Sequence, residues 1–128
     1  MYLLGDLLIR IKNGYRASRD SIEASYSKSN EEVLKKLEKL GFIKKYETKE
    51  EGGKKYFVIE LLYKDKESAL TEVKLFSKPG RRWYITVNEL RPVQDGMGYA
   101  IISTSQGVLT HIEAKKKKVG GELLFHIW

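Results

Sequence analysis

One segment decides how the carboxy-terminal half of the chain folds, and it reads Gly98-Tyr99-Ala100-Ile101-Ile102-Ser103-Thr104-Ser105-Gln106-Gly107-Val108-Leu109-Thr110. Apolar runs rich in β-forming residues stand at both of its ends, so we expect two strands with a polar loop between them. The loop carries three adjacent hydroxyl residues and closes with Gly107, which can adopt a positive φ. Such short side chains bury little apolar area, but each can both donate and accept a hydrogen bond. The loop is therefore either a plain connection or a contact tip for a surface of mixed donors and acceptors, such as the minor groove of RNA.

Length and composition narrow the class of protein. The chain has 128 residues, which suits one domain or two small ones, each able to bury a core. Cysteine is absent, which excludes disulfides and thiolate chemistry and fits a reducing compartment. The formal net charge of +7 favours an anionic partner, either nucleic acid or an anionic membrane surface.

The amino-terminal stretch argues against export. Met1-Tyr2-Leu3-Leu4-Gly5-Asp6 lacks a basic leading region, and Asp6 and Arg10 interrupt its apolar run, so we expect no signal peptide. Apolar stretches stay well below the roughly 18–20 residues that a membrane span needs. We expect a cytoplasmic protein with no membrane partner.

The first half of the chain predicts an αβαββ order. Apolar residues at helical spacing indicate a helix over 3–19, and a short strand over 22–26 follows. Ser29 and Glu32 have the spacing of a capping box, which predicts a second helix that runs to about Leu40. Residues 43–63 predict a hairpin that turns at 51–54. Apolar residues occupy both faces of its second strand, so we expect that strand to be buried on both sides.

The charged stretch over 64–68 is the predicted boundary between domains 1–64 and 65–128. After it the sequence predicts a turn at 78–80, a short helix over 112–118 that Gly120-Gly121 stops, and strands over 71–76, 83–87, 98–103 and 123–128. The predicted fold class is α+β. It comprises two small packed α+β domains, of which the second is mostly antiparallel β with one short helix.

Catalytic chemistry finds little support in the sequence. A serine hydrolase would need Ser103 or Ser105 beside a histidine and a carboxylate, and the Gly-x-Ser-x-Gly pattern is absent. We expect His111 to be exposed at the start of a helix and His126 to lie in a strand. Without cysteine or clustered histidine we expect no metal site. We predict no catalytic residue, cofactor or small-molecule substrate, and an esterase-like enzyme built on either serine is the alternative.

Basic and aromatic residues gather around one turn, Lys78-Pro79-Gly80-Arg81-Arg82-Trp83-Tyr84. The guanidinium groups can bind phosphates, and Tyr84 can stack on a base or a ribose. Alternation along a strand predicts that either Trp83 or Tyr84 is buried and the other exposed. Lys115 to Lys118 form a second cluster, which is either a solvated surface or faces an anion. Together these features make nucleic acid the leading partner.

Several motifs, in their order and spacing, resemble the small-subunit ribosomal protein eight family, in its bacterial or organellar form. The motifs are Arg10-Ile11-Lys12-Asn13, Tyr26-Ser27-Lys28, Leu40-Gly41-Phe42-Ile43, Ser77-Lys78-Pro79-Gly80-Arg81-Arg82, Gly96-x-Gly98-x-Ala100-Ile101, Ser103-Thr104-Ser105-x-Gly107 and Val119-Gly120-Gly121-Glu122.

The resemblance implies a structural constituent of the small ribosomal subunit that binds the central domain of 16S-type ribosomal RNA and helps its assembly. By position, the loop of Ser103, Thr104, Ser105 and Gly107 would enter the RNA minor groove, flanked by Tyr84 and Glu122. The phosphate-binding side chains would be Lys78, Arg81, Arg82, Lys115, Lys116 and Lys117. Glu122 would orient a loop hydroxyl or accept from a base amino group. Neighbouring small-subunit proteins would be further partners. The alternative is an extraribosomal translational repressor that binds messenger RNA of its own operon.

Overall fold

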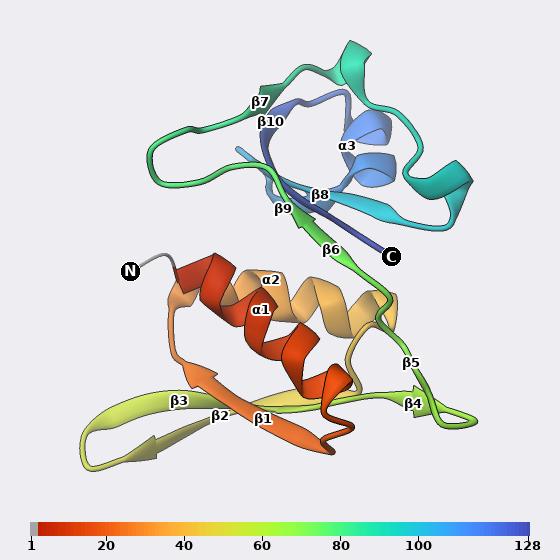
Figure 1. The fold of residues 1–128 in the computed structure, drawn as a ribbon. Helices are drawn as coiled ribbons and strands as arrows, with labels where there is room; N and C mark the ends of the chain where they lie inside the picture. Colours follow the sequence, from red (N-terminus) through yellow and green to blue (C-terminus); the bar gives the residue numbers. More distant parts are fainter. Residues whose placement is uncertain (1–2) are drawn as a thin grey trace. The chain divides into compact units, whose positions relative to one another are not determined.

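The computed structural model describes residues 3–128, and it confirms the α+β class, with three α-helices and antiparallel sheets in the described part of the chain (Figure 1). Met1 and Tyr2, which begin the stretch examined for a signal peptide, lie outside the described residues. The chain divides into a first unit that ends at Leu70 and a second that begins at Thr71. The charged stretch predicted as a boundary forms a small hairpin of the first unit, β4 (Tyr63–Lys64) with β5 (Glu67–Ser68). None of the helices within residues 3–128 has the length and the apolar character that a membrane span requires.

The first unit contains two helices and a three-stranded antiparallel sheet in the order β1-β3-β2. Its elements are α1 (Leu3–Arg16), β1 (Ser21–Ser25), α2 (Lys28–Leu40), β2 (Lys45–Glu51) and β3 (Lys54–Glu60). The predicted αβαββ order is confirmed, although α1 ends earlier than expected. The predicted cap of α2 is wrong, because the Ser27 hydroxyl, and not that of Ser29, accepts from the Asn30 amide at 3.3 Å. Ser27 is the last residue with extended backbone, and Ser29 already lies within the helix.

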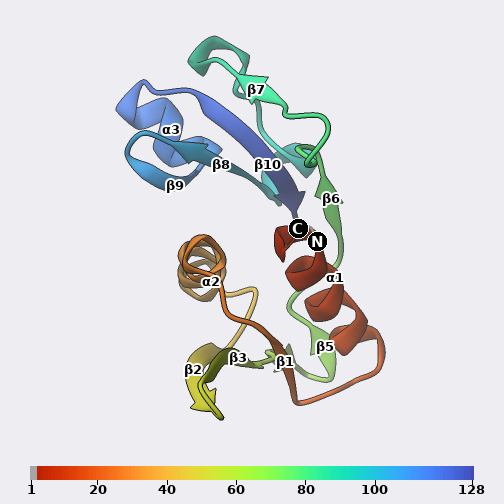
Figure 2. The same cartoon turned by 90° about the vertical axis from the view of Figure 1, so that its left-hand side faces the viewer.

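One face of this sheet is buried. Phe57 and Ile59 of β3 are buried, whereas Tyr56, Val58 and Glu60 between them are only partly buried. The prediction that β3 is buried on both sides is therefore wrong. Both helices of the unit lie on the same side of its sheet (Figure 2), so within the unit only that face can become core.

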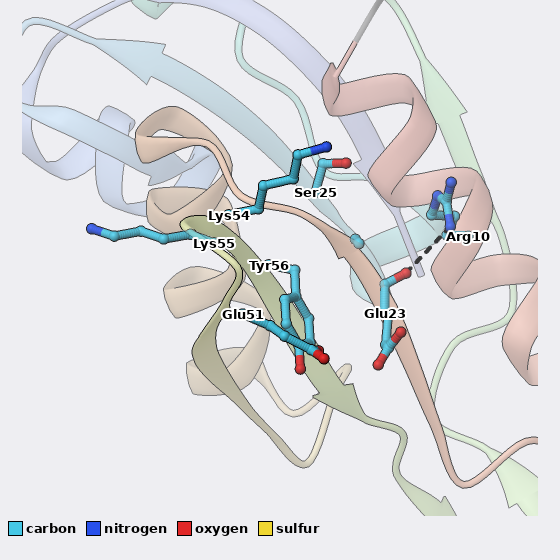
Figure 3. A pocket seen from close by; sticks show the side chains of 8 residues that line it. Arg10, Glu23, Ser25, Glu51, Lys54, Lys55 and Tyr56 are labelled. Atoms are coloured by element: carbon cyan, nitrogen blue, oxygen red, sulfur yellow. Dashed lines mark hydrogen bonds between the residues drawn. The ribbon is translucent and has the colours of Figure 1, made fainter.

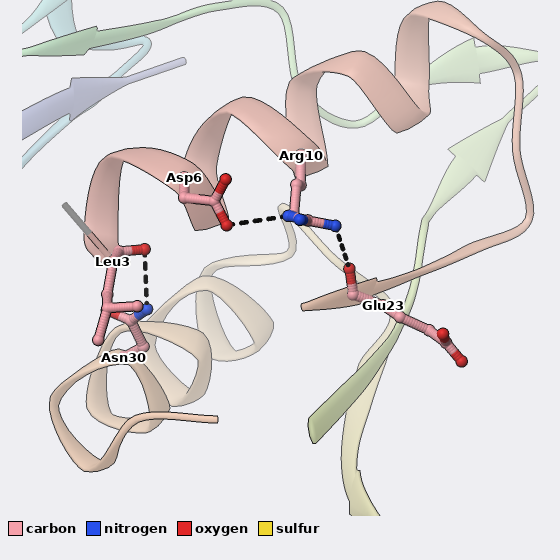
Figure 4. A network of polar contacts seen from close by, with 5 residues as sticks. All are labelled: Leu3, Asp6, Arg10, Glu23 and Asn30. Carbon is pink, nitrogen blue, oxygen red and sulfur yellow. Dashed lines mark hydrogen bonds and ion pairs between the residues drawn. The ribbon is translucent and has the colours of Figure 1, made fainter. Parts of the chain in front are cut away.

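Polar contacts attach α1 to its neighbours (Figure 4). The Arg10 Nε donates to Asp6 Oδ2 at 2.9 Å, and its Nη1 donates to the Glu23 carbonyl of β1 at 3.4 Å. The buried Asn30 of α2 donates to the Leu3 carbonyl at 3.0 Å. These bonds fix the start of α1 against α2 and its middle against β1.

The second unit is an antiparallel sheet with one helix. Its elements are β6 (Val73–Leu75), β7 (Tyr84–Ile85), the 3-10 turns η1 (Val87–Glu89) and η2 (Gln94–Gly96), β8 (Tyr99–Thr104), β9 (Gly107–Thr110), α3 (His111–Lys117) and β10 (Gly121–Ile127). The strand order is β6-β10-β8-β9, and β7 also pairs with β10. The core on the α3 side consists of Leu90, Val93, Ala100, Ile102, Leu109, Ala114 and Leu123.

The Gly120-Gly121 pair has a different role from the predicted one. Helix α3 ends because Lys118 adopts a left-handed conformation with φ 57°, before the glycines are reached. A Cβ on Gly121 would overlap the Ser103 carbonyl oxygen of β8, and one on Gly120 would overlap the Ile85 carbonyl oxygen. The two glycines therefore allow β10 to pass close to β7 and β8.

Candidate nucleic-acid interface

A row of polar side chains crosses the sheet of the second unit. In the strand register, Ser103 of β8 lies opposite Glu122 of β10, and Glu122 lies opposite Tyr84 of β7. Residues directly opposite one another point to the same face of a sheet. The core residues next to them in sequence, Ile102 and Leu123, point to the α3 side. The row of Ser103, Glu122 and Tyr84 therefore lies on the face away from α3.

The β8–β9 loop is held by one of its own hydroxyls. Thr104 Oγ1 donates to the Gly107 carbonyl at 2.8 Å and accepts from the Gln106 amide at 3.0 Å. Gly107 adopts φ 104°, as its place in the loop predicted. Ser103 and Ser105 are exposed, and their hydroxyls make no hydrogen bond within residues 3–128. The three hydroxyls thus differ in function: Thr104 shapes the turn, and the serines present free donors and acceptors.

The basic loop over residues 78–82 is closed at its base by Ser77. This residue is fully buried, and its Oγ accepts from the Trp83 amide at 2.9 Å and donates to the Trp83 carbonyl at 3.3 Å. Lys78 and Arg81 also exchange backbone hydrogen bonds of 3.0 and 2.9 Å. The loop therefore holds its exposed cations on a fixed backbone. Sequence reasoning did not assign this role to Ser77, and its only local signal is a small hydroxyl residue directly before the turn.

Glu122 holds an arginine of that loop. The Arg82 Nη1 lies 3.2 Å from Glu122 Oε2, and the glutamate side chain is only 20% exposed. The Leu123 amide also donates to the Trp83 carbonyl at 2.8 Å, which joins the loop to β10. The carboxylate thus orients Arg82 rather than a loop hydroxyl. Because a carboxylate offers about four acceptor sites, Glu122 keeps capacity for a further donor.

Both aromatic residues after the loop are exposed. Tyr84 is 71% exposed and Trp83 is 43% exposed, so the prediction that one of them is buried is wrong. Strand β7 begins only at Tyr84, and Trp83 precedes the pleated segment in which alternation applies. The Trp83 ring instead packs edge-on against Phe76, with ring centroids 5.3 Å apart. Tyr84 is left with an open ring face in the row.

Known proteins match this chain over almost its whole length. Residues 3–128 match the family described as "Ribosomal protein S8". The chain belongs to the ribosomal protein S8 family. A "Small ribosomal subunit protein uS8" from Coprothermobacter proteolyticus is 42% identical over 127 residues, covering 98% of this chain and 96% of the relative. Proteins of the same name from Dictyoglomus thermophilum and Thermus thermophilus are each 41% identical, covering 98% of this chain and 95% and 96% of the relative respectively. The family resemblance inferred from the motifs is confirmed. Proteins of the S8 family are structural, non-enzymatic components of the ribosome.

In this S8-family chain the α3 lysines and His111 lie apart from the polar row. Lys115, Lys116 and Lys117 are exposed on α3, which covers the opposite face of the sheet. His111 is the first residue of α3, as expected, but it is buried and not exposed as predicted, because its Nδ1 accepts from the Ala100 amide of β8 at 3.2 Å. Burial and the nearby Lys115 charge lower the pKa of His111.

The esterase-like alternative finds no support in this arrangement. His111 faces the core side of the sheet, whereas Ser103 points to the other side. His126 lies in β10 as predicted, opposite Ala100. In the part of the chain that the structure describes, no cluster of three or more histidine and carboxylate side chains could hold a metal ion.

A second polar surface, which sequence reasoning did not single out, lies in the first unit (Figure 3). It is a groove of about 430 Å³ beside the β2–β3 hairpin, lined in part by Arg10, Glu23, Glu51, Lys54 and Lys55. Its three cations stand among two carboxylates. The 78–82 loop carries three cations and meets one carboxylate, Glu122 of β10, which pairs with Arg82, so it is the stronger attractor for a polyanion.

Proposed function

We propose that this protein binds the central domain of small-subunit ribosomal RNA directly, through the second unit, and helps the assembly of the subunit. Its family makes it a small ribosomal subunit protein, bound to the ribosome. The observation that carries the proposal is the row of Ser103, Glu122 and Tyr84 beside a clamped basic loop, on a sheet face that α3 does not cover.

The chemistry of the row suits folded RNA. The minor groove of an RNA helix is wide and shallow, and it displays ribose 2′-hydroxyls and base edges. The Ser103 and Ser105 hydroxyls can exchange hydrogen bonds with those groups. Glu122 can accept from a 2′-hydroxyl or a base amino group while it keeps its pair with Arg82. Tyr84 can stack on an unpaired base or a ribose.

The cations would bind the phosphates that flank these contacts. We assign direct phosphate contacts to Lys78, Arg81 and Arg82, because Ser77 holds their loop in place and less conformational freedom is therefore lost on binding. We assign Lys115, Lys116 and Lys117 a contribution to the positive potential that attracts the RNA. Neighbouring small-subunit proteins would be the protein partners.

Replacement of Ser105 by alanine tests the proposal. Ser105→Ala should weaken binding to a central-domain RNA fragment by about 1–3 kcal/mol, because a buried polar group of the RNA would lose its partner. Filter binding measures the affinity, and urea unfolding should show unchanged stability. Ser68→Ala, at an exposed serine of β5, is the matched control and should leave affinity unchanged.

Equal affinities for Ser105→Ala and the unmodified protein would contradict the loop assignment. Cosedimentation with small subunits at moderate salt tests the ribosomal role separately. A protein that bound messenger RNA but did not cosediment would be the extraribosomal repressor, which the names of the relatives do not favour.

A further inference from the structure

An open groove of about 380 Å³ lies beside α3 in the second unit, away from the polar row. Leu90, Pro92 and Ile112 supply its apolar surface. Arg91, Lys115 and Lys116 supply its charged surface, and none of the residues that line it is acidic. The groove therefore combines an apolar floor with a rim of one sign of charge.

The apolar part of the groove is exposed. Ile112 lies in the first turn of α3 and is 57% exposed, whereas Ala114 of the same helix is fully buried in the core. The Ile112 side chain therefore does not contribute to the core of this unit. Covering this large aliphatic side chain, which is exposed beside Leu90 and Pro92, with another apolar group would remove apolar surface from water, which is favourable.

Hydrogen bonds hold the Arg91 guanidinium in place at the groove, but no direct ion pair within the described residues balances the positive charge there. The Arg91 Nη1 donates to the carbonyl oxygens of Asn88 and Leu90 at 2.9 and 3.1 Å, which fixes the guanidinium at the rim. Glu89 interacts electrostatically with Arg91, but within residues 3–128 neither Arg91 nor the two lysines form a direct ion pair with a carboxylate. A partner that brought carboxylates to this rim would meet a complementary surface.

The aliphatic surface of the groove favours an acidic peptide over RNA as its anionic partner. RNA recognition uses aromatic or guanidinium planes for stacking and polar groups for the sugar and base edges. Among the described residues that line this groove, the only aromatic ring is that of His111, which is buried and accepts a hydrogen bond from the Ala100 amide. Two backbone carbonyl oxygens fix Nη1 of Arg91, so the guanidinium is not a free plane for stacking, while its other N–H groups remain donors for a carboxylate. A peptide with aliphatic and acidic side chains matches both parts of the groove.

We propose that the groove between α3 and residues 90–96 docks an acidic segment of another small-subunit protein. An aliphatic side chain of that segment would cover Ile112, and its carboxylates would pair with Arg91, Lys115 and Lys116. The proposal rests on membership of the small subunit and not on the RNA contacts of the polar row, so the two can fail independently.

Site-specific crosslinking within the particle tests this docking. Ile112 is replaced by p-benzoylphenylalanine, the protein is reconstituted into small subunits, and the crosslinked peptide is sequenced after irradiation. We expect a protein segment that contains aliphatic and several acidic residues. Lys116→Glu should lower the crosslink yield about tenfold or more, because like charges would then meet at the rim. Lys117→Glu, on the same helix but outside the groove, is the matched control.

The proposal is overturned if position 112 crosslinks to RNA, to a segment without carboxylates or to nothing, or if both charge reversals act equally. A second measurement uses the isolated protein and needs no particle. A peptide of alternating glutamate and leucine should shift NMR signals of residues 90–96 and 111–116, and a version with serine for leucine should bind about tenfold more weakly. Equal shifts from both peptides, or stronger ones from polyuridylate, would also overturn it. Filter binding of RNA by the Ser105→Ala protein reports separately on the RNA contacts of the second unit.

Discussion

The two main hairpins of this protein have turns of the same length and opposite character. The β2–β3 turn consists of Gly52 and Gly53 at φ 59° and 79°, so the backbone alone makes the reversal and the tip presents no side chain. In the β8–β9 turn, Thr104 holds the reversal through its hydroxyl, and Ser105 occupies the tip. The first turn only connects its strands. The second displays polar groups in a fixed geometry, which is what a recognition loop requires.

The hairpins also differ in how far their tips are supported. Strand β1 pairs with β3 only as far as Tyr56, so Lys54 and Lys55 project beyond it (Figure 1). Strand β10 pairs with β8 up to Ser103, next to the turn. Recognition in the second unit therefore depends on a neighbouring strand as well as on the loop, and this dependence can be tested by substitution.

The largest effect on stability is expected from a side chain placed where β10 passes close to β8. Gly121→Ala places a Cβ on the Ser103 carbonyl, whose backbone cannot move aside, and should lower the free energy of unfolding by about 3 kcal/mol. Gly53→Ala meets no neighbouring atom and carries only the backbone strain of a positive φ, about 1–2 kcal/mol. Urea unfolding measures both. A Gly121→Ala protein as stable as the Gly53→Ala protein would show that the recognition hairpin does not depend on its neighbour.

Local patterns in the sequence account for most of the elements. The hairpin between residues 98 and 110, the positive φ at Gly107 and the end of α2 at Gly41 all follow from short-range chemistry of the chain. The motifs also identified the family, which the comparisons confirm. The assignment of individual residues to RNA contacts stays a prediction.

Features that depend on long-range pairing were not predictable from the sequence. The row of Ser103, Glu122 and Tyr84 exists because three distant segments take one particular register. The burial of His111 depends on the Ala100 amide reaching its ring. The exposure of Trp83 depends on where β7 begins. Alternation and helical spacing describe one segment at a time, so they cannot fix contacts between segments.

An intermediate effect is expected from loosening the recognition turn. Thr104→Val keeps the shape of the side chain and removes its two hydrogen bonds, so the free energy of unfolding should fall by about 1–2 kcal/mol. RNA affinity should also fall, because Ser105 would lose its fixed position. Thr48→Val, at an exposed threonine of β2, should stay within about 0.5 kcal/mol in urea unfolding. Unchanged filter binding by the Thr104→Val protein would mean that the turn need not be rigid.

The smallest effect is expected from removing a single phosphate contact. Arg81→Ala should reduce the slope of log affinity against log salt by about 0.7–0.9, the value for one released counterion. Lys49→Ala, at an exposed lysine of the first hairpin, should leave this slope unchanged. Filter binding at several salt concentrations provides both slopes. A slope counts the phosphates that a side chain neutralises, whereas an affinity at one salt concentration also includes long-range attraction. Equal slopes for the two variants would therefore mean that the loop held by Ser77 attracts RNA without touching its backbone.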